Sequence, residues 1–222
     1  MTTVGLIGSG RIGGTVAKLA VTAGHPVILS NSRGPDTLQD LASQLGPLAQ
    51  AGTGQEAAEG GELLVITIPL HAFQSVPAGP LAGKVVIDTC NYYPQRDGQI
   101  PELDSGAVTS SELIQRHLAG SAVVKVFNNI YYKHLRSLAR QPGTADRSAL
   151  PIAGDDEKAK ATVAAFLDSI GYDVVDTGAL AESWRQDSGS PASGAPYGPF
   201  SDPIGTPASA AKIRAALAAA HR

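Results

Sequence analysis

Short apolar runs alternate with stretches of helical periodicity along most of this 222-residue chain. The apolar runs, rich in β-branched residues, lie at 4–7, 27–30, 63–68, 85–89, 122–127, 150–153 and 173–176. Between them, apolar residues recur at helical spacing over 12–23 and 163–170, and a glycine follows each stretch. Alternating strands and helices imply right-handed crossovers on a sheet that is covered on both faces. The sequence therefore predicts an α/β protein with a doubly wound, mainly parallel sheet.

We expect three parts along the chain. Residues 1–120 form the main α/β domain, residues 121–187 a smaller α/β part that completes the sheet, and residues 188–222 an extension. In that extension, five prolines between 188 and 207 leave no room for a regular element, and an alanine-rich helix is expected at about 208–220. The proline-rich stretch is either a surface wrap or a functional arm, such as a lid, because long irregular loops are often functional.

Composition excludes several classes of function. The chain has 17 Lys and Arg against 20 Asp and Glu, a net charge of -3, so no strong positive field is available for nucleic acid. The longest apolar run, 63–70, is far shorter than the roughly 20 residues that cross a membrane, and no basic leader precedes it. A single Cys90 and scattered histidines predict no metal site. We expect a cytoplasmic protein that binds neither nucleic acid nor membrane.

A glycine motif follows the first apolar run directly. Gly8-Ser9-Gly10-Arg11-Ile12-Gly13 has the spacing G-x-G-x-x-G and lies between the predicted strand at 4–7 and the predicted helix at 12–23. In this context the first glycine permits a tight turn, the second lets a pyrophosphate approach the backbone, and the third lets the helix pack closely. We therefore predict a Rossmann-type dinucleotide site that includes Gly8, Ser9, Gly10, Arg11 and Ile12.

The residues after the second apolar run indicate which dinucleotide is bound. Sites selective for NAD carry an acidic residue here that accepts hydrogen bonds from the ribose, and this chain has none at that position. Asn31, Ser32 and Arg33 instead offer amide, hydroxyl and guanidinium donors for a 2′-phosphate. The alternative is a solvated turn with an incidental arginine. The prediction is NADP(H).

Other candidate residues follow the later strands, where parallel sheets bind their ligands. They lie in the segments 67–71, 88–93 and 126–132, which contain His71, Asn91, Asn128, Asn129 and two tyrosine pairs. Tyrosine rings and amide side chains suit a planar redox ligand, although ordinary packing at the sheet edge is the alternative. His71 is either a ligand contact or a partly exposed residue at a helix start.

Two catalytic patterns are absent from the chain. No tyrosine is followed four residues later by lysine, as in short-chain dehydrogenases, and no lysine lies between Lys160 and Lys212, where β-hydroxyacid dehydrogenases would carry one. The sequence offers no dedicated proton donor for a carbonyl substrate, and no catalytic residue is assigned.

Taken together, these motifs resemble the coenzyme F-420-dependent NADP oxidoreductases, which move a hydride between NADP(H) and a deazaflavin. The resemblance rests on the glycine motif, Asn31-Ser32-Arg33, Thr67-Ile68-Pro69, the stretch Val124-Lys125-Val126-Phe127-Asn128-Asn129-Ile130-Tyr131, and Pro151-Ile152-Ala153-Gly154-Asp155-Asp156. It implies that Ile68, Pro69 and His71 flank NADP, with Asn91 also on the cofactor side. It also implies that Asn128 and Ile130 approach the deazaflavin, with Asn129 and Tyr131 beside them.

The leading functional hypothesis is an NADP(H)-dependent oxidoreductase that transfers a hydride between NADPH and coenzyme F-420 or a similar planar acceptor. One alternative is an NADPH-dependent reductase of a small imine, carbonyl or metal ion, for which Tyr131 or His71 would have to supply the proton. Another is a non-catalytic NADPH-binding sensor. We expect a small-molecule redox acceptor as the partner, and a homodimer is one option that the sequence does not decide.

Overall fold

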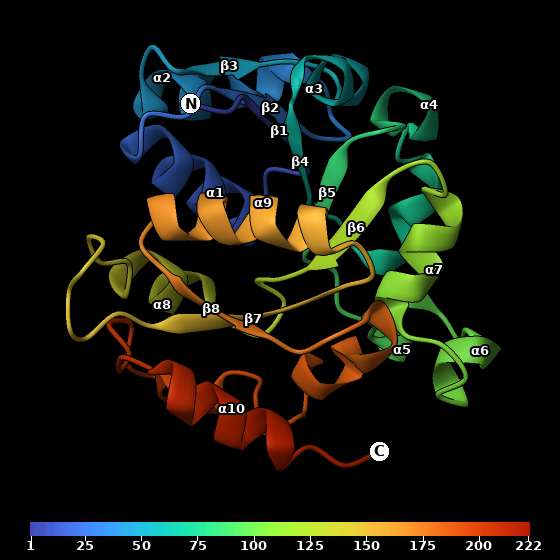
Figure 1. Cartoon of the computed structure of the whole chain (residues 1–222). Coiled ribbons are helices and arrows are strands. Elements are labelled where there is room, and N and C mark those ends of the chain that lie inside the picture. Colours follow the sequence, from blue (N-terminus) through green and yellow to red (C-terminus); the bar gives the residue numbers. More distant parts are fainter.

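Eight strands form one sheet in the computed structural model, which describes residues 1–222 (Figure 1). They are β1 (Val4–Ile7), β2 (Val27–Ser30), β3 (Ala49–Ala51), β4 (Leu63–Ile66), β5 (Val85–Asp88), β6 (Ala122–Lys125), β7 (Ala149–Gly154) and β8 (Asp173–Asp176). Their order across the sheet is β3-β2-β1-β4-β5-β6-β7-β8. β1 to β6 run parallel, β7 is antiparallel to β6, and β8 is parallel to β7. The predicted doubly wound, mainly parallel α/β fold is confirmed.

Helices cover both faces of this sheet, which is why β1 and β4 are buried along their whole length and read as unbroken apolar runs. The helices are α1 (Arg11–Thr22), α2 (Gln39–Leu45), α3 (Gly54–Gly60), α4 (Ala78–Leu81), α5 (Pro94–Asp97), α6 (Pro101–Asp104), α7 (Ser110–His117), α8 (Tyr132–Ser137), α9 (Glu157–Ser169) and α10 (Ala210–Ala218). α1 and α9 pack in the larger apolar core, and α3, α4 and α7 pack in a second core. Figure 1 shows β7 and β8 between α9 and α10.

Local signals in the sequence determine how two of these helices begin. The Thr53 side chain accepts a hydrogen bond from the Glu56 amide, and Glu56 accepts one from the Thr53 amide in return. The same reciprocal arrangement joins Thr109 and Glu112 at the start of α7. Each capping box satisfies backbone donors that a helix end would otherwise leave free.

The structure differs from the sequence-based element bounds in several places. The short edge strand β3 was not predicted, because it has only three residues and none of them is β-branched. The predicted runs at 63–68, 85–89 and 122–127 are too long, because the chain leaves the sheet after β4, β5 and β6 to form the ligand edge. The terminal helix is shorter than 208–220. One turn of 3₁₀-helix, Ala195–Tyr197, does form within the proline-rich stretch, where Pro196 occupies its first turn.

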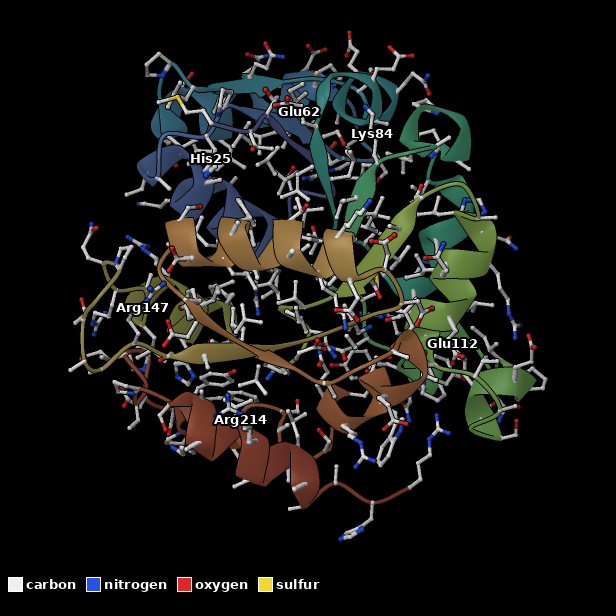
Figure 2. All side chains as sticks on the ribbon, viewed as in Figure 1. His25, Glu62, Lys84, Glu112, Arg147 and Arg214 are labelled. Atoms are coloured by element: carbon white, nitrogen blue, oxygen red, sulfur yellow. The ribbon has the colours of Figure 1, made fainter.

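Buried or shielded cations tie neighbouring elements together (Figure 2). The Lys84 ammonium, just before β5, donates to the carbonyl oxygens of Ala58, Glu59 and Gly61 at distances of 2.7, 2.8 and 2.8 Å. It therefore occupies the carbonyl end of α3, where the helix dipole favours a cation. Arg147, before β7, pairs with Asp168 at 2.6 Å. These contacts hold the helical layers in register with the sheet below the ligand edge.

Candidate functional site

The glycine turn after β1 has the geometry that its motif predicts. Gly8 has φ of +104°, and a Cβ atom there would lie 2.5 Å from the Thr67 carbonyl oxygen. A Cβ atom on Gly13 would lie 2.3 Å from the Gly8 carbonyl oxygen, since α1 packs directly on the turn. The Thr67 hydroxyl donates to that same Gly8 oxygen at 2.8 Å. Glycine is therefore required at both positions, for backbone conformation at Gly8 and for close approach at Gly13.

The start of α1 fits a dinucleotide pyrophosphate. Gly10 is the residue before the helix, no side chain caps it, and a Cβ atom built on it would meet nothing within 4 Å. The amide N–H groups of the first turn of α1 therefore remain available, and the open space above Gly10 lets an anion approach them. The Ser9 hydroxyl donates to the Ser30 carbonyl oxygen at 2.8 Å, which ties the glycine turn to the end of β2.

The predicted 2′-phosphate residues follow β2 on an exposed turn. The Asn31 side-chain oxygen accepts the Arg33 amide at 2.9 Å, and the Asn31 amide group donates to Thr37 at 2.9 Å. Ser32 and Arg33 are exposed, and the Arg33 guanidinium has no carboxylate partner within 4.0 Å. The turn is thus held by Asn31 while its hydroxyl and guanidinium donors face solvent.

A pocket of about 310 Å³ opens beside the glycine turn. Its lining comes from the start of α1, the segments after β5 and β6, and the C-terminal arm: Arg11, Ile12, Thr89, Asn91, Tyr93, Phe127, Asn128, Asn129, Ile130, Tyr131, Tyr132, Ser188, Ser193, Gly194 and Phe200. The structure thus brings seven residues predicted from the sequence to one cavity: Arg11, Ile12, Asn91, Asn128, Asn129, Ile130 and Tyr131. The lining contains an arginine and no carboxylate.

Three predicted cofactor residues follow β4, and they do not line this pocket. Ile68 packs at the edge of the second core, Pro69 is exposed, and the exposed His71 ring bonds to Asp97 at 3.0 Å. Asp97 also accepts hydrogen bonds from Arg96 and from the Tyr93 amide. Burial would raise the pKa of Asp97, but these hydrogen bonds outweigh it and hold the pKa well below its ordinary value. Asp97 therefore stays ionised and links the end of β4 to the pocket rim.

Two amide side chains form the inner wall of the pocket. The Asn91 amide group donates to the Asn128 carbonyl oxygen at 2.7 Å, and the Asn128 amide group donates back to the Asn91 side chain at 3.2 Å. Asn128 also donates to the Gln186 carbonyl oxygen at 3.0 Å and accepts from the Gln186 side chain at 3.0 Å. This network joins the ends of β5 and β6 to the segment that leads into the arm.

The backbone has an unusual conformation at Phe127, just before the two asparagines. Phe127 is the one non-glycine residue with positive φ, at 67°, and its ring is fully buried. The left-handed conformation is costly for a side chain of this size, and such residues often occur near functional sites. Next along the chain, Asn129 donates to the Ala192 carbonyl oxygen at 2.9 Å while its own side-chain oxygen is buried without a donor.

A buried ion pair beneath the pocket was missed by the sequence analysis. Asp88 and Lys125 end β5 and β6 side by side, both fully buried, with 3.1 Å between the carboxylate and the ammonium. Lys125 also donates to Ser110 at 3.0 Å and to the Cys90 carbonyl oxygen, while Asp88 accepts the Cys90 amide at 2.7 Å. The pair therefore holds both sides of the Cys90 residue and positions Asn91 beside it. The available signal was a charged residue inside each of two otherwise apolar runs.

Electrostatics keep Lys125 charged and leave the thiol unreactive. Burial would lower the pKa of Lys125, but the carboxylates of Asp88 and Asp187 outweigh it and raise the pKa. Burial, and then the Asp88 charge, raise the pKa of the Cys90 thiol. Burial also raises the pKa of Asp187, although Lys125 opposes that shift. Cys90 is thus a small buried residue without the thiolate character that nucleophiles need.

The four paired tyrosines have different surroundings. Tyr93, Tyr131 and Tyr132 line the pocket, and the Arg11 guanidinium carbon lies 5.4 Å from the centre of the Tyr132 ring. Tyr92 has a structural role instead, because its hydroxyl donates to Asp104 at 2.7 Å and accepts the Ile100 amide at 2.9 Å. Three of the four paired tyrosines therefore line the pocket, and Tyr92 does not.

Comparison with known proteins places this architecture in context. Residues 3–92 match the family described as NADP oxidoreductase, coenzyme F420-dependent, a range that includes the glycine motif, Asn31 to Arg33 and Thr67 to Pro69. No match was found among curated protein sequences. No helix of the chain has both the length and the apolar character that membrane crossing requires.

Solved structures share most of the fold. A hypothetical protein from Sinorhizobium meliloti superposes with a TM-score of 0.74 at 27% identity, covering 85% of this chain and 91% of its own. A proposed F420-dependent NADP-reductase from Arthrobacter sp. gives 0.69 at 27% identity, covering 82% and 87%. A pyrroline carboxylate reductase from Plasmodium falciparum with NADP bound gives 0.55 at 12% identity, covering 83% and 60%, which shows the fold alone. The family resemblance is confirmed, and the family and the structural neighbours indicate an NAD(P)-dependent oxidoreductase.

Proposed function

We propose that this protein transfers a hydride between NADP(H) and a planar redox acceptor, with coenzyme F-420 as that acceptor. One observation carries the proposal. Arg11 and Ile12, which begin the helix after the glycine turn, line the same pocket as the stretch Asn128 to Tyr131. A dinucleotide at the turn and an acceptor in the pocket would therefore be neighbours. Hydride transfer requires such proximity, because the reacting atoms must approach to about 3–3.5 Å.

The residues around the turn supply cofactor binding in this proposal. The free amides of α1 and the Arg11 side chain bind the pyrophosphate, and Asn31, Ser32 and Arg33 bind the 2′-phosphate. We further propose Ile68, Pro69, His71 and Asn91 on the nicotinamide side of the site. The matched family supports this half of the proposal, since its description names NADP and its match contains every one of these residues.

On the acceptor side, Asn128, Asn129, Ile130 and Tyr131 hold and orient the acceptor ring. When bound, NADPH would supply the hydride for the acceptor ring, and water would supply the proton that completes the reduced ring. No buried group of the pocket needs to donate that proton. Lys125 is sealed below the pocket and Cys90 is held as a thiol. The protein would therefore act mainly by positioning.

A second candidate function is reduction of a small imine or carbonyl, which does require a proton donor. Tyr131 favours it, because this half-buried phenol lines the pocket, whereas the His71 ring lies outside it and bonds to Asp97.

One experiment separates these functions. The protein is mixed with NADPH and oxidised F-420, and the deazaflavin absorbance is followed over time. We expect the absorbance to fall, and to fall more slowly with NADH. Turnover of a cyclic imine or a small aldehyde without any change in F-420 would favour the second candidate. Tight NADPH binding with no turnover of any acceptor would contradict both and indicate a sensor.

A further inference from the structure

The C-terminal arm, residues 188–207, forms part of the pocket wall. It contributes Ser188, Ser193, Gly194 and Phe200 to the lining. Its position is fixed, because the Gly194 amide donates to the Asn129 carbonyl oxygen at 2.8 Å and the buried Tyr197 hydroxyl donates to the Ala149 carbonyl oxygen at 2.9 Å. His134 bonds to the Asp202 carbonyl oxygen at 2.7 Å on the other side of Phe200. The arm is thus built into the pocket and held on both sides of its exposed aromatic residue.

Exposed aromatic rings gather at this pocket. Five large apolar side chains of the chain are exposed, and two of them, Tyr93 at 37% and Phe200 at 66%, line the pocket. Phe200 packs against the half-buried Tyr131, with ring centres 5.1 Å apart and an angle of 45° between the planes. These rings come from three distant segments: the start of α5, the segment before α8, and the arm. Large apolar surface that is held in water beside a cavity indicates a ligand that covers it.

The chemical class of the ligand follows from these rings. An aromatic side chain gains most from an apolar, flat partner that stacks on it, and the pocket presents three such rings with amide groups behind them. We propose that Phe200, Tyr131 and Tyr93 form a ring-binding wall, and that Phe200 on the arm determines the preference for planar, conjugated acceptors. This inference rests on the proposed function in assigning the pocket to the acceptor, and it adds a specificity-determining residue outside the matched family range.

The arm contains its own control for testing this inference. Ile204 is exposed to 65%, almost as much as Phe200, and it does not line the pocket. Truncating either residue to alanine removes an exposed apolar side chain from the same segment, so both variants should fold equally well. A difference in ligand binding between Phe200→Ala and Ile204→Ala therefore reports on the pocket and not on arm stability.

Binding is measured without turnover, by quenching of ligand fluorescence in protein saturated with NADP⁺. The probes are oxidised F-420 and riboflavin, two flat tricyclic molecules with different rings. We expect saturable quenching with at least one probe, and a dissociation constant about 3- to 10-fold higher for Phe200→Ala, the range for loss of an aromatic contact. Ile204→Ala and Phe200→Tyr should match the wild type.

Several outcomes would overturn the inference. One is that neither probe shows saturable quenching. Another is that Phe200→Ala binds the probes as tightly as wild type. A third is that Phe200→Ala and Ile204→Ala lose the same amount of probe affinity. Calorimetric titration of the same variants with NADP⁺ distinguishes failure of the ring-binding wall from failure of the proposed function. Normal probe binding without hydride transfer from NADPH would support the ring-binding wall and contradict the proposed reaction. Hydride transfer to F-420 that is unchanged in Phe200→Ala would support the proposed reaction and contradict the ring-binding wall.

Discussion

The two sides of the candidate site are built in different ways. The glycine turn after β1 is made of backbone: its amides, its positive φ at Gly8 and its contact with Thr67 use few side chains. The acceptor side depends on buried side chains, with Lys125 and Asp88 beneath it and Asn128 bonded to Gln186 behind it. A backbone site can be recognised from a short motif, whereas a side-chain network becomes visible only when distant segments are in place.

The largest expected effect comes from breaking the buried pair on the acceptor side. Lys125→Met leaves the Asp88 carboxylate buried without its ammonium, so the free energy of unfolding should fall by about 3–5 kcal/mol. Urea denaturation followed by the fluorescence of Trp184, the single tryptophan, measures this. The matched control is Lys158→Met, an exposed residue without an ion pair, which should stay within about 0.5 kcal/mol. Equal stability of the two variants would show that the acceptor side does not depend on this charge pair.

A second test separates ligand binding from folding within the glycine turn. Gly10→Val places a side chain in the open space above α1, so NADPH affinity should fall at least tenfold, about 1.4 kcal/mol, with stability unchanged. Gly13→Ala instead forces a Cβ atom against Gly8, so stability itself should fall by about 1–3 kcal/mol. Calorimetry and thermal unfolding of both variants provide the comparison. Normal NADPH affinity in Gly10→Val would mean that the turn is structural and binds no dinucleotide.

The third test concerns the turn after β2, which also belongs to the cofactor side. Removing the exposed guanidinium in Arg33→Ala should weaken NADP(H) binding by about 1.5–3 kcal/mol, the range for hydrogen bonds to a charged group, and leave NAD(H) binding nearly unchanged. Titration of both cofactors into wild type and variant tests this. Arg136→Ala, which removes another exposed arginine, serves as the control. Similar losses for the two cofactors would show that Arg33 does not read the 2′-phosphate.

The smallest expected effect lies at Asp97, which connects the two sides. Its folded pKa is below the ordinary value, so its stabilisation is complete above the unfolded carboxyl pKa of about 3.9 and is lost as pH falls through that range toward the folded pKa. Asp97→Asn should therefore be less stable than wild type at pH 6, by no more than about 1 kcal/mol, and the gap should narrow between about pH 4 and pH 2. A gap that is independent of pH would assign the effect to packing.

The sequence predicted most of the fold because strand and helix periodicities are local properties. It also identified the glycine turn, whose residues adjoin one another along the chain. It missed β3, which is only three residues long and has no β-branched residue, and it extended β4 to β6 into the loops that carry ligand-edge residues such as Asn91. Three of the inaccurate bounds therefore lie at strand ends next to the pocket.

For the site itself, the limit of prediction was set by long-range contacts. Lys125 had been noted only as part of a family motif, since nothing in its neighbourhood along the chain reveals that Asp88 lies opposite it. Phe200 had not been considered, because the proline-rich arm has no periodicity that would place it. Asn128 was expected near a ligand, but its bonds to Asn91 and Gln186 depend on two other loops. Residue type and strand ends indicated the region, and the tertiary structure assigned the partners.

The anchoring of the arm also has a consequence for the order in which the site assembles. The bonds described above that fix the arm join residues 48 to 68 positions apart, such as Tyr197 with Ala149 and His134 with Asp202. The cofactor turn is held by one bond across 21 positions, between Ser9 and Ser30, and by one across 59, between Thr67 and Gly8. The arm is synthesised after all eight strands, whereas every residue of the cofactor turn has been made once the chain has passed β4 and Thr67. We therefore expect a nascent chain to form its cofactor turn first and its aromatic wall last. In a newly made molecule, selectivity among acceptors would then be acquired later than the capacity to bind a dinucleotide.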